Sequence, residues 1–319
     1  MAIPSGETAQ APGLRAAGHP PALLEPVHEH FGVRVHGLDL RNPLPPARLA
    51  ELHEAFDTHS LLIFPDQPLS RAEFVRFAEQ FGPIDTVKVG SVGAGSKVSR
   101  STNLREDGEI DSVSGRLSLT VLANQQWHTD SSFKSRPALA TALLAELLPP
   151  VGGETEFAST RAAFEALPDD LRMRACALSG FHSYAYSRDR IAPGLMSEAE
   201  RCALPRVEHP LVRQHPVTGT RSLFIGAHLG LIRGLSPAAG RSIIEQLTGF
   251  ATDDRFVYRH AWQQHDLLLW DNRCTLHRGR PWDMARYGRV LSHISIADTG
   301  PDCDAPRWPR AETTTGDIQ

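Results

Sequence analysis

Two metal-binding side chains, His128 and Asp130, lie two positions apart in the segment NQQWHTDSSF, residues 124–133. In an extended chain alternate side chains point to one face, so this imidazole and this carboxylate can bind one ion together. A third ligand must come from elsewhere, and His277 follows an apolar run in LLLWDNRCTLH, residues 267–277. Two histidines and one carboxylate form a facial triad, which leaves positions open on a divalent metal for a chelating cosubstrate and dioxygen. The spacing therefore indicates a catalytic metal site.

The same residue types also have simpler explanations. The chain has 15 histidines, so an H-x-D triplet with a histidine downstream arises by chance as well. His28 and His30 form a competing pair, but they border an irregular segment in which a solvated surface is typical. His182, His215 and His228 could support the ligands or face a substrate, although buried histidines are commonly structural. Spacing alone therefore leaves the triad as one hypothesis among several.

A cosubstrate with two carboxylates needs a cation for its far end. Arg289 lies twelve residues after His277 at the start of a strand-like run, and a guanidinium binds a carboxylate as a planar fork. Arg286 is a nearby competitor for this role. Thr155, in GGETEF at residues 152–157, could add a hydroxyl beside the arginine.

Several ordered motifs resemble those of the iron(II)/2-oxoglutarate dioxygenases that act on taurine and 2,4-dichlorophenoxyacetate, especially the branch that degrades aryloxyalkanoates. The resemblance covers about residues 28–300. Its motifs are WHTDSSF (127–133), PPVGGETEF (149–157), HPVTG (215–219), WDNRCTLH (270–277) and Arg289. It implies that the iron ligands are His128, Asp130 and His277. It also implies that the residues around the 2-oxoglutarate carboxylate are Thr155, Arg289 and Trp270.

The resemblance further implies a reaction. Iron(II), 2-oxoglutarate and dioxygen would yield succinate and CO2 while a substrate carbon is hydroxylated. If the substrate is an aryloxyalkanoate, hydroxylation beside the ether oxygen releases a phenol and an oxo acid. The alternatives are a taurine-like sulfonate or secondary-metabolite oxygenase of the same family. Two further alternatives come from other classes of protein: a zinc-dependent hydrolase and a non-catalytic small-molecule binder.

One position departs from the family pattern. The taurine and dichlorophenoxyacetate enzymes carry a second arginine four residues after the cosubstrate arginine, and it helps to bind the anionic group of the substrate. This sequence has His293 there, and a neutral imidazole offers one hydrogen bond in place of a charged fork. We therefore expect substrate anchoring to involve Lys88 or Arg278 beside His293. The spacing from His277 to Arg289 is one residue longer than in the family, which a turn insertion explains.

Charge and cysteine content narrow the class of protein. The 319 residues carry 33 Lys+Arg and 37 Asp+Glu, a net charge of −4, which argues against general nucleic-acid binding. The four cysteines form no C-x-x-C pair, so neither a zinc ribbon nor a disulfide scaffold is indicated. No apolar run approaches the roughly 18 residues of a membrane span, and no signal-peptide pattern is present. We expect a cytoplasmic enzyme with a small-molecule substrate and no nucleic-acid or membrane partner. A homo-oligomer, common in the family, would fit.

The sequence predicts some of the helices and strands that must position these residues. Leu49, Leu52 and Phe56 repeat at helical spacing before an apolar strand at 60–64, and Ser70 with Glu73 has capping-box spacing. Two more helices are predicted at 160–167 and 236–247, the second one ended by Gly249. The remaining predicted strands are 139–144, 223–226, 256–260, 267–270 and 290–296.

These elements predict a domain organisation and a fold class. No regular βαβ alternation and no G-x-G-x-x-G loop occur, which argues against a Rossmann sheet. Residues 1–25 are expected to form a flexible leader, 26–300 a single dioxygenase domain, and 301–319 a tail. The Gly/Ser-rich segment 85–118 is expected to be an active-site lid loop. The fold class is α+β, mainly β, a jelly roll with flanking helices. The resemblance specifies a double-stranded β-helix.

Overall fold

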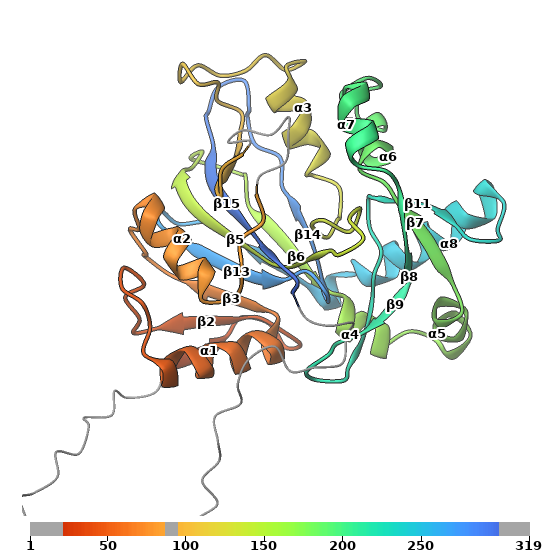
Figure 1. The fold of residues 1–319 in the computed structure, drawn as a ribbon, viewed down its shortest axis with the longest axis horizontal. Coiled ribbons are helices and arrows are strands. Elements are labelled where there is room, and N and C mark those ends of the chain that lie inside the picture. Colours follow the sequence, from red (N-terminus) through yellow and green to blue (C-terminus); the bar gives the residue numbers. More distant parts are fainter. Residues whose placement is uncertain (1–21, 87–94, 300–319) are drawn as a thin grey trace, which may run out of the picture.

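The computed structural model describes residues 22–86 and 95–299 (Figure 1). Within them, the largest sheet has seven strands in the order β1-β2-β3-β13-β5-β15-β4. All neighbours are antiparallel except β2 and β3. The strands are β1 Leu23–Pro26, β2 Val33–His36, β3 Leu61–Phe64, β13 Leu267–Asp271, β5 Ala138–Leu147, β15 Val290–Ala297 and β4 Ser99–Thr102.

The two faces of this sheet pack on different partners because side chains alternate along each strand. On β13, Leu267 and Leu269 join a core with Phe56 of α1 (Pro46–His59) and Phe77 of α2 (Arg71–Glu79). Leu268 and Trp270 point the other way, into a second core that includes Phe157. The helices therefore cover the outer face, and the inner face meets a second layer of strands.

The second layer is built from three smaller sheets. The sheet that faces the large one has the order β12-β6-β14, and the others are β11-β7-β8 and β10-β9. Their strands are β6 Thr155–Ser159, β7 Ser179–His182, β8 Val207–Pro210, β9 Val212–Gln214, β10 Arg221–Leu223, β11 Leu229–Ile232, β12 Val257–His260 and β14 Thr275–Gly279. Leu276 of β14 packs outward on Phe164 and Leu247. Two layers of strands with helices outside match the predicted α+β jelly roll.

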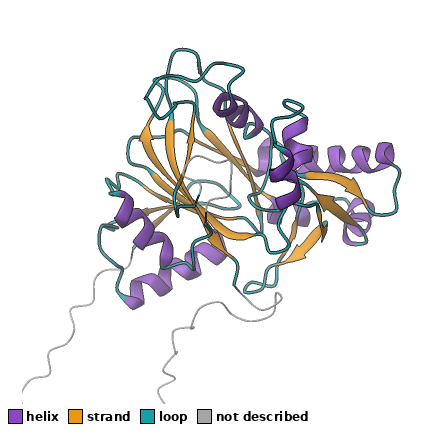
Figure 2. Cartoon of the chain, turned by 45° about the horizontal axis from the view of Figure 1, so that its top comes forward, coloured by secondary structure: helices purple, strands orange, loops and turns teal. Residues whose placement is uncertain are grey.

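The remaining helices flank the second layer and one end of the sheets, so the helices lie on either side of the strands in Figure 2. They are α3 Arg116–Ala123, α4 Thr160–Glu165, α5 Asp169–Cys176, α6 Tyr184–Asp189, α7 Glu198–Ala203 and α8 Pro237–Ala251, with a 3-10 turn at Asp254–Phe256. The sequence did not predict α3, α5, α6 or α7, each of which has eight residues or fewer.

Some boundaries differ from the prediction. The expected leader cannot extend to residue 25, because β1 begins at Leu23 and pairs with β2. The segment 85–118 is not simply a loop, since it contributes β4 to the large sheet and the start of α3. Helix α8 continues past Gly249 because Leu247 and Ala251 are buried beneath it, and this packing outweighs the helix cost of one glycine, about 1 kcal/mol. Residues 1–21, 87–94 and 300–319, which include Lys88 and the expected tail, lie outside the described residues.

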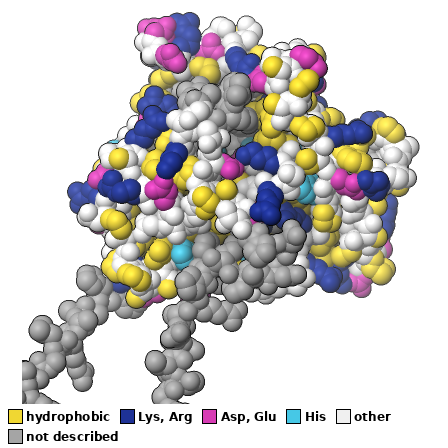
Figure 3. All heavy atoms as spheres, viewed as in Figure 1, with side chains coloured by type: hydrophobic (Ala, Val, Ile, Leu, Met, Phe, Trp, Pro, Cys, Tyr) yellow, Lys and Arg dark blue, Asp and Glu magenta, His cyan; other side chains and the backbone are white. Residues whose placement is uncertain are grey.

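The surface carries mixed charge. On the face drawn in Figure 3, basic and acidic side chains are interspersed. In the described ranges, none of the helices combines the length and the apolar character that crossing a membrane requires.

Candidate metal centre

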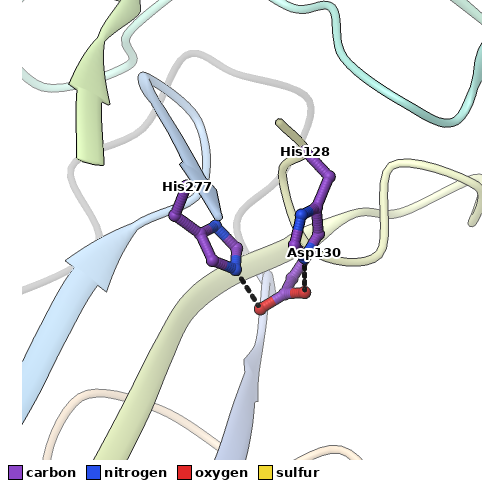
Figure 4. A group of neighbouring side chains, drawn as sticks. All are labelled: His128, Asp130 and His277. Carbon is purple, nitrogen blue, oxygen red and sulfur yellow. Dashed lines mark ion pairs between the residues drawn. The ribbon is translucent and has the colours of Figure 1, made fainter. Parts of the chain in front are cut away.

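A backbone pairing brings two distant histidines together. His128 N–H donates to the carbonyl of His277 at 3.0 Å, and His277 N–H donates to the carbonyl of His128 at 2.8 Å. His277 lies opposite Phe157 in the β14–β6 pairing, on the face that points toward the large sheet. Asp130 follows two residues after His128. The three side chains converge between the two layers, as Figure 4 shows.

The spacing of these three side chains suits one metal ion. One ligand atom from each of His128, Asp130 and His277 lies within 4.8 Å of the others. The Asp130 oxygens are 3.8 Å from His128 Nε2 and 3.7 Å from His277 Nε2 (Figure 4). These separations are too long for hydrogen bonds. They leave room for one ion among the three side chains.

The protonation states also suit a metal. His128 Nδ1 lies 2.7 Å from the carbonyl of Gln126, so Nδ1 carries the proton and the Nε2 lone pair faces Asp130. Burial lowers the pKa of His128, and it lowers the pKa of His277 to about 3, so both imidazoles are neutral near pH 7. Burial raises the pKa of Asp130, but His277 and His293 outweigh it and hold this carboxyl pKa well below its usual range. Two neutral imidazoles and a carboxylate are the forms that bind divalent metals.

Neighbouring groups hold the carboxylate in place. Thr141 Oγ1, on β5, donates to Asp130 Oδ2 at 2.7 Å and accepts from Asn272 Nδ2 at 2.9 Å. Trp270 Nε1 donates to Asn272 Oδ1 at 3.0 Å. The Trp270 ring also lies 4.7 Å from the His277 ring. The Trp270 indole therefore packs on His277, and hydrogen bonds through Asn272 and Thr141 link it to Asp130. The sequence prediction missed Thr141 and Asn272, which look like ordinary core and turn residues.

Thr155 and Arg289 lie together behind the triad. Arg289 Nη2 is 3.4 Å from Thr155 Oγ1, and Trp262 Nε1 donates to the same oxygen at 3.0 Å. Arg289 is 4% exposed, its Nε has no hydrogen-bond partner, and it forms no ion pair with any carboxylate in the described ranges. Burial lowers its pKa to about 10, although nearby Glu154 opposes this change. A buried, unpaired guanidinium is costly and is typically completed by an anion.

The rival Arg286 differs from Arg289. It is exposed and lies over the Tyr287 ring at 5.2 Å, on the surface. Of the two arginines, the structure therefore places Arg289 beside Thr155 and leaves Arg286 in solvent.

A cavity of about 190 Å³ opens in front of His128 and Asp130. The other lining side chains that concern the argument are mostly aromatic or charged: Arg100, Arg116, Phe133, Lys134, Tyr184, Arg188, His228 and His293. His293 Nε2 is 3.5 Å from Asp130 Oδ2, and its Nδ1 is 3.1 Å from Ser99 Oγ. The sequence prediction missed Arg188 and Tyr184, which lie in a short helix without a motif.

One expected substrate anchor, Arg278, is not among these lining residues. Arg278 follows His277 on β14 and therefore points to the opposite face, where its Nε donates to Glu156 at 2.7 Å and it covers the Trp127 ring. The structure does not bring Arg278 to the cavity. Lys88 lies outside the described ranges.

The other singled-out histidines take different places. His228 lines the cavity, with Nδ1 at 2.9 Å from Ser187 Oγ. His215 is buried against Asp271 and Asp57. His182 is fully buried without a hydrogen-bond partner in the described part of the chain. His28 and His30 pack on each other near the surface.

Comparison with known proteins gives consistent relatives. Residues 23–294 match the family model described as taurine catabolism dioxygenase TauD, TfdA family. The chain is 40% identical over 281 residues to an alpha-ketoglutarate-dependent 2,4-dichlorophenoxyacetate dioxygenase from Cupriavidus pinatubonensis, covering 86% of this chain and 98% of the relative. It is 36% identical over 282 residues to an (S)-phenoxypropionate/alpha-ketoglutarate-dioxygenase from Sphingobium herbicidovorans, covering 86% and 94%.

Solved structures agree with these relatives. The crystal structure of AAD-2 in complex with Mn(II) and N-oxalylglycine superposes with a TM-score of 0.81 at 36% identity, covering 88% of this chain and 99% of that one.

Proposed function

This chain belongs to the taurine catabolism dioxygenase TauD, TfdA family and is an iron(II)- and alpha-ketoglutarate-dependent dioxygenase, and from this premise we propose that it cleaves aryloxyalkanoates. The family resemblance read from its motifs is thereby confirmed. Alpha-ketoglutarate is 2-oxoglutarate, so the cosubstrate prediction is confirmed as well. The observation that carries the proposed substrate class is the 40% identity over 98% of a 2,4-dichlorophenoxyacetate dioxygenase.

We assign the site residues as follows. His128, Asp130 and His277 hold iron(II), because their ligand atoms converge in the protonation states that a metal requires. Arg289 and Thr155 hold the distal carboxylate of 2-oxoglutarate, because Arg289 is a buried guanidinium without a counter-ion in the described ranges. Trp270 packs on His277 and steadies it.

When bound, iron(II) and 2-oxoglutarate would supply the oxidation: with dioxygen, 2-oxoglutarate would give succinate and CO2, and a substrate C–H bond would be hydroxylated. The chain itself orients the groups. Thr141 and Asn272 fix the Asp130 carboxylate, and the cavity walls position the substrate beside His128 and keep bulk water out. We also propose that the described ranges act as one catalytic domain, in which β4 and α3 form cavity walls.

The cavity suits an aryl group. Phe133, Tyr184 and His228 form an aromatic wall, with ring centroids 4.7 Å apart for Phe133 and Tyr184 and 4.9 Å apart for Phe133 and His228. The His228 ring is 6.1 Å from that of His128. Aromatic side chains pack favourably on a flat ring. Taurine has no such ring, so this wall favours an aryl ether over a small sulfonate.

A substrate panel tests the proposal. We expect 2,4-dichlorophenoxyacetate and the two 2-phenoxypropionate enantiomers to give succinate and a phenol in equal amounts, with taurine giving neither. Turnover of taurine without turnover of any aryl ether would overturn the substrate class. Omission of dioxygen or 2-oxoglutarate must stop the reaction, because a zinc hydrolase would need neither.

A further inference from the structure

The cavity in front of the triad is lined by four basic side chains, and three of them have a carboxylate partner. The pairs are Arg100 with Glu146, Arg116 with Glu200 and Lys134 with Asp85. The fourth, Arg188, forms no ion pair with any residue in the ranges 22–86 and 95–299. The cavity therefore contains one positive charge that the described chain does not balance.

Arg188 is held rigidly despite lacking a counter-ion. It lies in α6, is 7% exposed, and its Nε is buried without a hydrogen-bond partner in the described residues. Its Nη2 donates to Asn124 Oδ1 at 3.2 Å, and its Cζ lies 4.4 Å from the centre of the Tyr184 ring. A neutral amide and an aromatic face orient a guanidinium without neutralising it. Burial of an unpaired charge is costly and is typically relieved by an anion.

Arg188 also lies beside the aromatic wall of the cavity. It packs on Tyr184, which belongs to the aromatic wall with Phe133 and His228. Arg188 and His128 line the same cavity, and the His228 ring lies between them, 5.8 Å from the Tyr184 ring and 6.1 Å from the His128 ring. One wall therefore offers both an aryl-packing surface and a cation beside a proposed iron ligand.

Of the expected anchors, the structure describes His293 and Arg278, and both have partners of their own. His293 contacts both Asp130 and Ser99, and Arg278 faces the opposite side of β14. We propose that Arg188 binds the carboxylate of the substrate, which replaces the anchoring arginine that the family pattern places at position 293. This inference rests on the proposed function of the cavity. Carboxylate and aryl group flank the carbon beside the ether oxygen, so holding both presents that C–H bond to the metal.

The test compares Arg188→Gln with Arg190→Gln, because Arg190 is an exposed arginine two residues away. Two quantities are measured: the calorimetric Kd of 2,4-dichlorophenoxyacetate without dioxygen, and the KM in succinate release. We expect Arg188→Gln to raise both by about 30-fold or more, as truncating a buried charge pair does. Binding of the neutral amide of the same acid should not change. Arg190→Gln should match the wild type throughout.

A second variant covers the case in which Arg188→Gln does not fold. Arg188→Lys keeps the charge but loses the planar fork, so we expect it to retain preference for the acid over the amide with a weaker Kd for the acid. An unchanged Kd and KM for the acid in either folded variant would overturn the inference while leaving the proposed function intact. Loss of binding in Arg188→Gln, together with a wild type that releases no phenol, would overturn the proposed function and support the anion site.

A sulfonate ligand tests whether the site prefers a carboxylate to other anions. In the wild type, equal affinity for 2,4-dichlorobenzenesulfonate and 2,4-dichlorophenoxyacetate would overturn the carboxylate assignment.

Discussion

Two buried clusters in this molecule contain the same residue types but differ in what surrounds them. The open cluster is His128, Asp130 and His277, and the closed cluster comprises Asp57, His215 and Asp271. In each cluster, three potential ligand atoms lie within 4.8 Å of one another. Distance and composition alone would therefore make both of them metal sites.

The closed cluster contains its own cation. Arg273 Nη2 lies 3.0 Å from Asp57 Oδ1, and its Nε lies 2.8 Å from Asp271 Oδ1. His215 Nε2 is 3.1 Å from Asp271 Oδ2. Burial raises the pKa of Asp271, but Arg273 and His215 outweigh it and hold the pKa far below its usual range. Arg273 pairs with both carboxylates, so the chain supplies this cluster with a cation of its own, and the two pairs join α1 to the end of β13.

In the ranges that the structure describes, no lysine or arginine pairs with the carboxylate of the open cluster, and the cluster borders a cavity. Its carboxylate is held by the neutral hydroxyl of Thr141, and His277 Nδ1 has no hydrogen-bond partner in the described residues. The open cluster is therefore distinguished by a carboxylate without a lysine or arginine partner in the described residues and by access to a cavity. Residue type and proximity do not distinguish it.

The largest expected effect is loss of activity on removal of a ligand from the open cluster. His128→Ala or Asp130→Ala should lower substrate-dependent succinate formation by more than about 100-fold, since loss of an outer partner alone costs about 10–100-fold. Far-UV circular dichroism should show retained folding, and the exposed His30→Ala should retain wild-type activity. Normal turnover in both ligand variants would remove the assignment of these residues as ligands.

Removal of the cation from the closed cluster should lower the free energy of unfolding. Arg273→Met would leave Asp57 and Asp271 as buried carboxylates without their main cation, which costs about 3–5 kcal/mol of unfolding free energy. Urea denaturation measures this change. The control is Arg255→Met, whose exposed pair with Asp253 should contribute less than about 1 kcal/mol. Equal effects of the two variants would show that Arg273 is not the main cation of the closed cluster.

Local sequence patterns predict an element correctly where the residues that determine it lie within the segment itself. The capping box of Ser70 and Glu73 is formed, and the apolar run before Asp271 is a fully buried strand. Strict alternation would also have excluded Arg278, because consecutive residues on β14 must face opposite sides. The outward direction of Arg278 is therefore encoded in the sequence itself.

Other features depend on contacts between distant segments. β4 has the sequence SRST, with no apolar alternation, and becomes a strand only by pairing with β15. Arg188 looks like a surface residue of a polar helix until the fold buries it against Asn124. The supporting role of Thr141 appears only when β5 is placed beside Asn272. No local propensity encodes such relations, so the sequence alone could not predict them.

A smaller effect should follow from the hydroxyl that supports the open cluster. Thr141→Val keeps the shape of the side chain but removes its hydrogen bond to Asp130. We expect about 10–100-fold weaker Mn(II) binding in an anaerobic titration, because outer partners fix the orientation of metal ligands. Thr252→Val, whose hydroxyl bonds to the carbonyl of Thr248 far along α8, is the matched control. Unchanged metal affinity in Thr141→Val would show that the carboxylate is held by packing alone.

The smallest effect concerns a buried histidine outside both clusters. Burial lowers the pKa of His182 to about 3, and His209 and Arg213 add to this. The unfolded chain takes up a proton near pH 6.5 while the folded chain does not, so stability is full above that pH and falls as the pH decreases toward 3. The expected slope is about 1.4 kcal/mol for each pH unit. His182→Phe should remove this contribution, so its urea stability should decrease less than that of the wild type between pH 7 and pH 5.5. Parallel losses in the two proteins would mean that His182 is protonated equally in both states. Burial of His182 would then have no effect on its pKa.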